Sequence, residues 1–243
     1  MSKSSRLGVT GLLALGVLSM PSAPSQAQQR PIVDKLAKTY GIDSFGQVEA
    51  IRYTFNAQLP GVEVSRSWTW EPKTDQVTYE SKDKSGQPVK VTYLRSQLDS
   101  QPPDVKDNID PSFVNDNYWL LLPFHIFWDT NAAVEDAGKQ VVPLGKGSAE
   151  KIIVKYPPDG GYSQGDTWDL YVGGDNRIEA FVYHRGGPKK PSVVTATWTD
   201  YKKAGPLLLS LDHPGKADDK PLHVSLSNVA VRLAGSNAWT DAK

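Results

Sequence analysis

Apolar and polar residues alternate with a period of two over much of this chain, which is the pattern of half-buried β-strands. In the first such segment Ile51, Tyr53 and Phe55 alternate with polar residues. Turn-forming residues such as Pro60-Gly61 separate the segments. The pattern predicts strands over 51–59, 62–70, 76–81, 89–94, 167–172, 177–184, 193–201, 207–211 and 222–233.

The final predicted strand contains a slip in this alternation. Its apolar residues change phase between Leu226 and Val229, which predicts a bulge near Ser227-Asn228. Asp212-His213, followed by Pro214-Gly215, is interpreted as a turn. Roughly nine to eleven strands in one antiparallel sheet must curl strongly or close. The fold class is therefore mainly β, with a concave face that a helix can fill.

Two segments have the period of a helix. Residues 31–40 place apolar side chains on one face, and Gly41 follows where a C-terminal cap belongs. Asp110-Pro111 favours a second helix start, with the aspartate as N-cap and the proline in the first turn. That helix is expected to run to about Leu121 and stop before Pro123, where one or two further turns begin. Residues 129–152 are polar, and no strand is predicted there.

The most apolar tract of the chain is Tyr118 to Trp128, YWLLLPFHIFW. Nine of its eleven residues are large and apolar or aromatic, although the mean hydropathy of the chain is −0.43. A bilayer requires about 20 apolar residues, so the tract is too short to span one. It must therefore lie in a core or face an apolar ligand or partner.

Residues 1–27 have the pattern of a secretory signal peptide. Lys3 and Arg6 precede an apolar run, and Ser25-Gln26-Ala27 supplies small residues for cleavage. This predicts a mature domain of residues 28–243, periplasmic or secreted, without a membrane anchor. The chain has no cysteine, which excludes disulfides and a lipid-bearing cysteine. Removing the leader leaves 25 basic and 27 acidic side chains, a balance that gives no attraction to nucleic acid.

Motifs for catalysis, metals and cofactors are scarce. The four histidines have no metal-ligand spacing, and His125 is interpreted as a hydrogen-bonded core residue. Asp166 and Asp169 are three apart on a predicted strand and therefore point to opposite faces. No GxSxG, GxGxxG or P-loop pattern occurs. We expect no metal, no cofactor and no catalytic residue, and nothing in the sequence points to an oligomeric state.

Several segments resemble known exported proteins. The order of elements is similar to that of the periplasmic lipoprotein-carrier superfamily, that is, the lipoprotein localisation factors and outer-membrane lipoprotein-sorting proteins. The elements are a leader, a short helix, the strands VEAIRYTFNAQ and VSRSWTWEP, an apolar helix and further strands. A closer resemblance is to a group of exported bacterial proteins with no assigned activity. Five segments carry it: SRSWTWEPKTDQVTYE, FVNDNYWLLLPFHIFWD, GDTWDLYV, RIEAFVYHRGG and TATWTDY. One position departs from the carrier pattern: Glu71 precedes Pro72 where the carriers have arginine, and Arg66 is the nearest basic residue on that strand.

The resemblance implies a strongly curved, unclosed antiparallel barrel whose concave face is covered by helices and shelters acyl chains. A lipid or a lipoprotein acyl chain would then be the partner. Transferred by position, the predicted apolar cavity is lined by Tyr53, Phe55, Trp68, Trp70 and Tyr79 on the sheet and by Tyr118, Trp119, Leu122, Phe124 and Phe127 on the helix.

Three functions remain open from the sequence. A carrier or sensor of apolar molecules predicts an open cavity with those linings. An envelope structural or interaction module predicts a filled core and a separate exposed apolar patch. An enzyme requires His125 or His213 to lie within hydrogen-bond reach of a carboxylate in a cleft.

Overall fold

The computed structural model describes residues 26–83, 85–159, 161–187 and 190–243. The predicted signal peptide, residues 1–27, lies outside this part of the chain except for its last two positions. The helices are α1 (Gln26–Tyr40) and α2 (Asp110–Trp128), with short helical turns η1 (Ile42–Gln47), η2 (Arg95–Ser100) and η3 (Val105–Ile109). The strands are β1 (Val48–Leu59), β2 (Val62–Glu71), β3 (Gln76–Lys82), β4 (Pro88–Leu94), β5 (Ala133–Val141), β6 (Ser148–Lys155), β7 (Thr167–Val172), β8 (Ile178–His184), β9 (Val193–Thr197), β10 (Thr199–Ala204), β11 (Leu207–Ala217), β12 (Lys220–Leu233) and β13 (Trp239–Asp241).

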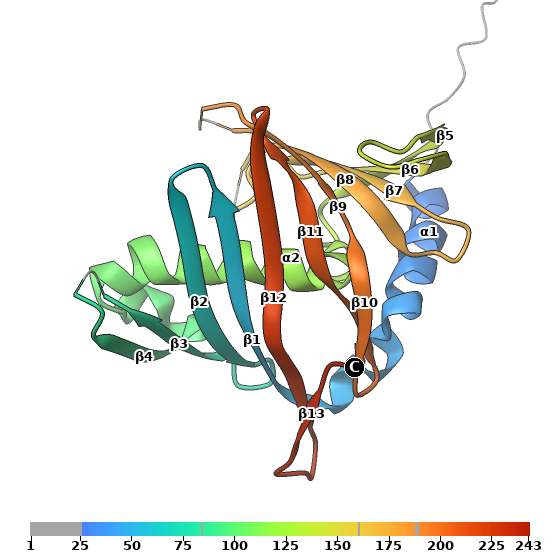
Figure 1. The fold of residues 1–243 in the computed structure, drawn as a ribbon. Coiled ribbons are helices and arrows are strands. Elements are labelled where there is room, and N and C mark those ends of the chain that lie inside the picture. Colours follow the sequence, from blue (N-terminus) through green and yellow to red (C-terminus); the bar gives the residue numbers. More distant parts are fainter. Residues whose placement is uncertain (1–25, 84, 160, 188–189) are drawn as a thin grey trace, which may run out of the picture.

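All these strands belong to one antiparallel sheet, which curves around α2 (Figure 1). The strand order is β4-β3-β2-β1-β12-β11-β9-β8-β7-β6-β5, with β10 paired to β11 and β13 to β12. β4 and β5 form the two edges and do not pair with each other, so the sheet is not closed. This confirms the predicted fold class of an open, strongly curved antiparallel sheet with few helices.

The alternation located most of the strands to within a few residues, and the predicted bulge is confirmed. Arg52 pairs with Ala230 but Thr54 pairs with Ser227, so β12 contributes one extra residue there. Asn228, at the bulge, has a positive φ of 53°. One predicted strand, 193–201, divides into β9 and β10 at Trp198, whose ring is buried.

Residues 129–152 were expected to contain no strand, and this was wrong. β5 and most of β6 lie there, at the edge of the sheet. β5 is largely exposed and carries few apolar side chains, so it gives almost no alternation signal. Its ladder to β6, interrupted between Asp136 and Lys139, supplies the hydrogen bonds that the sequence pattern could not reveal.

The interpretation of His213 as a turn residue was also wrong. It lies in the middle of β11, opposite Val224, and is fully buried. The following Pro214-Gly215 continues the strand because Gly215 lies against the backbone of Thr195 on β9, where a side chain would collide with the carbonyl oxygen. Pro214-Gly215 therefore marks a close approach of the β11 and β9 backbones and not a turn.

Acid should destabilise the protein through His213. Burial lowers its pKa from 6.5 to about 3, against the opposing effect of the Thr197 carbonyl that Nδ1 contacts at 3.3 Å. Below pH 6.5 His213 is therefore protonated in the unfolded chain but stays neutral in the folded chain. The free energy of unfolding falls as the pH drops toward 3. We expect His213 to account for a loss of about 2 kcal/mol between pH 7 and pH 5, measured by urea unfolding. His213→Phe should reduce that slope, although the part due to His125, whose pKa is lowered to the same extent, should remain; an unchanged slope would contradict the assignment.

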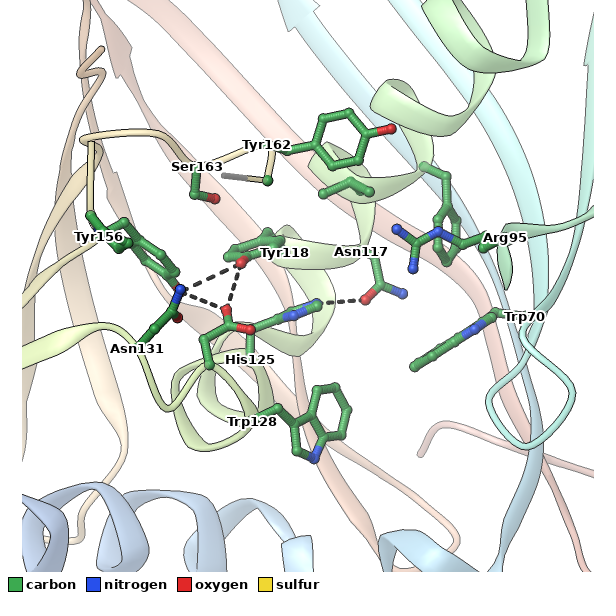
Figure 2. A pocket seen from close by; sticks show the side chains of 15 residues that line it. Trp70, Arg95, Asn117, Tyr118, His125, Trp128, Asn131, Tyr156, Tyr162 and Ser163 are labelled. Carbon is green, nitrogen blue, oxygen red and sulfur yellow. Dashed lines mark hydrogen bonds between the residues drawn. The ribbon is translucent and has the colours of Figure 1, made fainter. Parts of the chain in front are cut away.

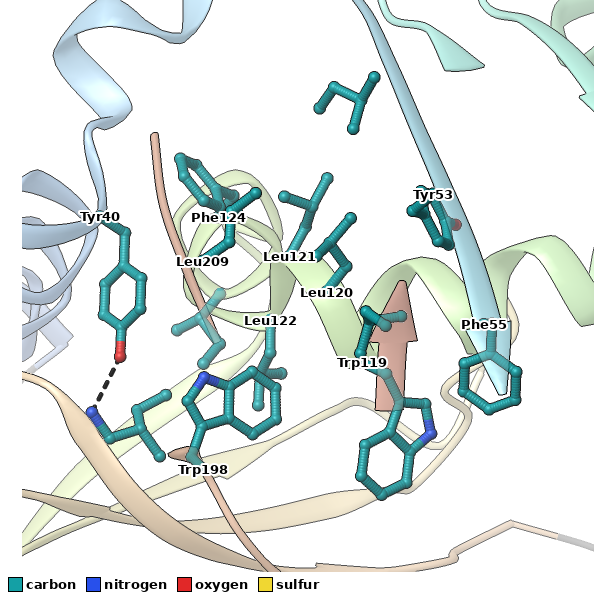
Figure 3. Close-up of a cluster of buried hydrophobic side chains, with 14 of the residues drawn as sticks. Tyr40, Tyr53, Phe55, Trp119, Leu120, Leu121, Leu122, Phe124, Trp198 and Leu209 are labelled. Atoms are coloured by element: carbon teal, nitrogen blue, oxygen red, sulfur yellow. Dashed lines mark hydrogen bonds between the residues drawn. The ribbon is translucent and has the colours of Figure 1, made fainter. Parts of the chain in front are cut away.

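α2 fills the concave side of the sheet. Its residues Leu120, Leu121 and Phe124 are fully buried in one core with side chains from both halves of the sheet (Figure 3). Leu121 departs from helical geometry, with φ −120° and ψ 20°, so α2 consists of two helical pieces. A joint near Pro123 was predicted and is observed two residues earlier, although the helix does not stop there. Burial of this apolar tract compensates for the roughly 3 kcal/mol that a proline costs inside a helix.

The predicted start of this helix needs a correction. Asp110 is itself helical, because η3 runs directly into α2, and it does not act as the N-cap. Its carboxylate is completely buried and accepts hydrogen bonds from Tyr93, Arg95 and Tyr162. The residue that looked like a cap is therefore a buried anchor that joins the helix to β4, η2 and the loop before β7.

Candidate functional site

The face of α2 that turns away from the sheet lines a cavity of about 460 Å³ (Figure 2). Its walls come from α2, from Trp70 at the end of β2, from Arg95 at the start of η2, and from the loop between β6 and β7. This volume lies within the usual range for small-molecule sites. We call it the outer cavity, since α2 separates it from the core.

Aromatic rings form a continuous series along this cavity. Each ring centroid lies 3.9–6.4 Å from the next, and Tyr118 and His125 stack with their planes only 8° apart. We name this series the aromatic belt; it runs in the order Tyr156, Tyr118, His125, Trp128, Trp70 and Phe113. Phe113 is buried, while the other members are partly exposed and can contact a ligand.

The polar groups of the outer cavity are held in place by hydrogen bonds. Asp129 accepts bonds from the hydroxyls of Tyr118 at 2.7 Å and Tyr156 at 2.9 Å. His125 Nε2 lies 2.7 Å from Oδ1 of Asn117, so the predicted hydrogen bond is confirmed, although the ring lines the outer cavity and not the core. Burial, with a smaller effect of the charge of Arg95, lowers the pKa of His125 to about 3. His125 is therefore neutral at physiological pH.

A second cavity of about 410 Å³ adjoins the first. Both are lined by Val114 and Tyr118 of α2 and by Tyr162 and Ser163. The second cavity continues over Trp119 and on to β7, β8 and β9, and Arg185 lies at its rim. Tyr162 stands between the two and is fixed there by its 2.7 Å hydrogen bond to Asp110.

The predicted cavity residues divide into three groups. Tyr53, Phe55, Trp68, Leu122 and Phe124 are buried, with exposed fractions of 3% or less, in the core between the sheet and α2. Trp70 and Tyr118 line the outer cavity, and Trp119 lines the second one. Tyr79 and Phe127 are partly buried and pack against the core. The predicted set thus lies on both sides of α2, and its ligand contacts stay a prediction.

The sequence did not single out Arg95, Asp129, Tyr156 or Tyr162 as site residues. They come from η2, from the end of α2 and from the β6–β7 loop, where no motif marks them. Only the apolar tract Tyr118 to Trp128 indicated where the site would lie. A search for polar residues next to that tract would have found Asp129, which follows it directly.

The histidines named for an enzyme do not meet carboxylates. His125 pairs with the amide of Asn117, and Nδ1 of His213 contacts the carbonyl of Thr197. The described residues contain no cluster of three or more His, Cys, Asp or Glu side chains arranged to hold a metal ion. In the same part of the chain, no helix is long and apolar enough to cross a membrane.

The position that departs from the carrier pattern has a structural role. Glu71 lies 3.3 Å from Nη2 of Arg232 on β12. Arg66, the nearest basic residue on that strand, forms a bidentate ion pair with the buried Asp116 of α2, at 2.7 and 2.6 Å. Glu71 therefore joins β2 to β12, and Arg66 joins β2 to α2.

Solved structures similar to this chain include the kinds of protein that the sequence resembles. A DUF1329 family protein from Desulfovibrio piger is 8% identical, with a TM-score of 0.46, over 86% of this chain and 95% of that one. A LolA superfamily protein from Nitrosomonas europaea is 9% identical, with a TM-score of 0.46, over 84% and 93%. A putative outer membrane lipoprotein-sorting protein domain from Vibrio parahaemolyticus is 8% identical, with a TM-score of 0.43, over 84% and 95%.

No protein-family model and no curated protein matches the sequence. The three similar structures are only 8–9% identical to this chain. With TM-scores below 0.5, they give no basis for transferring a ligand, a partner or a site residue to this chain.

Proposed function

We propose that this protein is an exported, non-catalytic binding protein for an apolar or amphipathic small molecule, which it holds in the outer cavity of α2. The aromatic belt is the observation that carries the proposal. Trp70, Trp128 and Tyr118 are partly exposed and line the cavity, although each also packs against neighbouring rings. Aromatic surface of this kind is enriched where proteins bind apolar groups, and few polar groups then fix the orientation of the ligand.

The position of the ligand differs from the one implied by the sequence resemblance. The concave face of the sheet is occupied by Leu120, Leu121, Leu122 and Phe124, which are exposed by 1% or less. An acyl chain would have to displace these side chains, at a cost of several kcal/mol of buried apolar surface. The outer cavity requires no such displacement.

Binding of the neutral fluorescent probe N-phenyl-1-naphthylamine tests this proposal. The wild-type protein should bind the probe, and Trp70→Ala and Trp128→Ala should each weaken the affinity at least tenfold, or about 1.4 kcal/mol. Trp239→Ala is the matched control, because Trp239 is also partly exposed but lies on β13, outside the cavity. Wild-type protein that binds no probe, or unchanged affinity in both cavity variants, would refute the proposal.

The filled core favours a second function, that of an envelope interaction module. This role needs an exposed apolar patch. The exposed large apolar residues in the described part of the chain are Val62, Val141, Leu144 and Val193, and only Val141 and Leu144 share a hairpin. A wild-type protein that binds no apolar probe would leave this module as the better account.

A further inference from the structure

The outer cavity has an excess of negative charge. Apart from tyrosines, its ionisable lining residues are Arg95, His125 and Asp129. His125 is neutral at physiological pH, as argued above, and contributes no charge. The sign of the net charge that lines the cavity therefore depends on Arg95 and Asp129.

The charge of Arg95 is already neutralised. Its Nε donates to Asp110 at 2.8 Å, and Nη1 lies 3.8 Å from Asp75. Asp110 is fully buried, so its interaction with Arg95 is only weakly screened by water. One arginine thus faces two carboxylates, and the group as a whole does not attract an anion.

Asp129 has no such partner. In the described part of the chain its carboxylate forms no ion pair with Lys, Arg or His. Its two hydrogen bonds, from Tyr118 and Tyr156, both end on Oδ2. Neither uses Oδ1, and a ligand can therefore contact that oxygen.

The arrangement of these groups gives the cavity two ends. Figure 2 shows Tyr118 and Tyr156, the donors to Asp129, on one side and Arg95 on the other, with the Asn117–His125 pair between them. Trp128 and Trp70 form the wall below this pair. A cation near Asp129 would thus lie beside Tyr118 and Tyr156 at one end of the aromatic belt, and aromatic rings attract positive charge.

We propose that the ligand of the outer cavity carries an alkylated ammonium group, which binds between Asp129 and the aromatic belt. This inference rests on the proposed function and names the chemical class of its ligand. An alkylated ammonium fits better than a bare metal ion or a primary amine, because its methyl groups cover aromatic surface and its charge is weakly hydrated. The apolar part of the molecule then extends along Trp128 and Trp70.

A series of three benzyl compounds of different charge tests the inference. Isothermal titration calorimetry would compare benzyltrimethylammonium, neutral benzyl alcohol and phenylmethanesulfonate. The wild-type protein should bind the ammonium at least tenfold more tightly than the alcohol, and the sulfonate least tightly. An ammonium that binds no better than the alcohol would overturn the inference without any variant.

Asp129→Asn removes the charge but keeps an oxygen acceptor for a tyrosine hydroxyl. It should lower the ammonium affinity at least tenfold and change the alcohol affinity much less. Asp136→Asn is the control, because Asp136 is an exposed aspartate on β5 that does not line the outer cavity. An ammonium affinity that survives in Asp129→Asn would contradict the inference.

The two proposals fail in different ways. If N-phenyl-1-naphthylamine binds and requires Trp70 and Trp128, but the ammonium has no advantage, the proposed function stands and the ligand class is wrong. If neither probe binds, both fail. Flotation with phosphatidylcholine vesicles separates the sources of the cation: binding to vesicles indicates a lipid headgroup, and binding of the free ammonium alone indicates a small soluble compound.

Discussion

Asp116→Ala is expected to destabilise the protein by about 3–5 kcal/mol, because it leaves Arg66 facing α2 without its counter-ion. The Asp116 carboxylate is completely buried and accepts both Arg66 bonds and a third, at 2.8 Å, from Nε1 of Trp68. Burial raises the pKa of Asp116, and the bonds and charge of Arg66 oppose that shift. Three donors from β2 would lose their acceptor in the variant.

Urea unfolding followed by circular dichroism measures this loss. Glu80→Ala is the control: it removes the surface ion pair with Lys90, which has a 2.8 Å contact but two largely exposed side chains. Surface pairs of this kind contribute about 0–1 kcal/mol. A loss below about 1 kcal/mol in Asp116→Ala would show that the pairing of β2 with α2 is not a main contribution to stability.

Opposite faces of α2 should respond differently to alanine. Phe124→Ala is expected to cost about 3–5 kcal/mol and Leu122→Ala about 2–5 kcal/mol, because both side chains are fully buried in the core. Tyr118→Ala removes a partly exposed ring and the hydrogen bond to Asp129, so we expect a loss of only about 1–2 kcal/mol. Its larger effect should be on binding, where the affinity for N-phenyl-1-naphthylamine should fall at least tenfold.

Melting temperature and probe affinity, measured on the same samples, separate the two faces. Trp119→Ala and Phe127→Ala extend the series to the second cavity and to a side chain packed on the core. The folded Phe124→Ala protein should keep the affinity of the wild type. If all five substitutions lower the melting temperature and none changes probe binding, α2 is plain core and the binding function is wrong.

Local pattern was enough to predict much of the fold. Alternation around Tyr53 and Phe55 marked β1, since one face of that strand is buried in the core and the other carries polar residues that are mostly half-buried. The same rule failed for β5, an exposed edge strand. It also failed at His213, because the Pro214-Gly215 that follows it predicts a turn, whereas Gly215 is needed there for the close approach of two strands. Edges and close backbone contacts are set by tertiary structure, so a period-two pattern does not report them.

The candidate site was only half predictable. The apolar tract Tyr118 to Trp128 identified the helix, but its apolar residues occupy so much of the circumference that no single ligand-facing side stands out. Phe124 and Tyr118 therefore looked equivalent. The groups that complete the outer cavity are paired across long stretches of sequence, as Asp110 is with Tyr162 and Asp129 with Tyr156. Such pairings appear only once the chain is folded.

We expect a ligand to bind on the outer face of α2 and not between α2 and the sheet. Native mass spectrometry of the protein, purified without detergent from a host that exports it, tests this directly. We expect a small-molecule adduct on the wild type and on Phe124→Ala, and its loss from Trp128→Ala. A wild type without an adduct, or an adduct that Trp128→Ala keeps and Phe124→Ala loses, would contradict it.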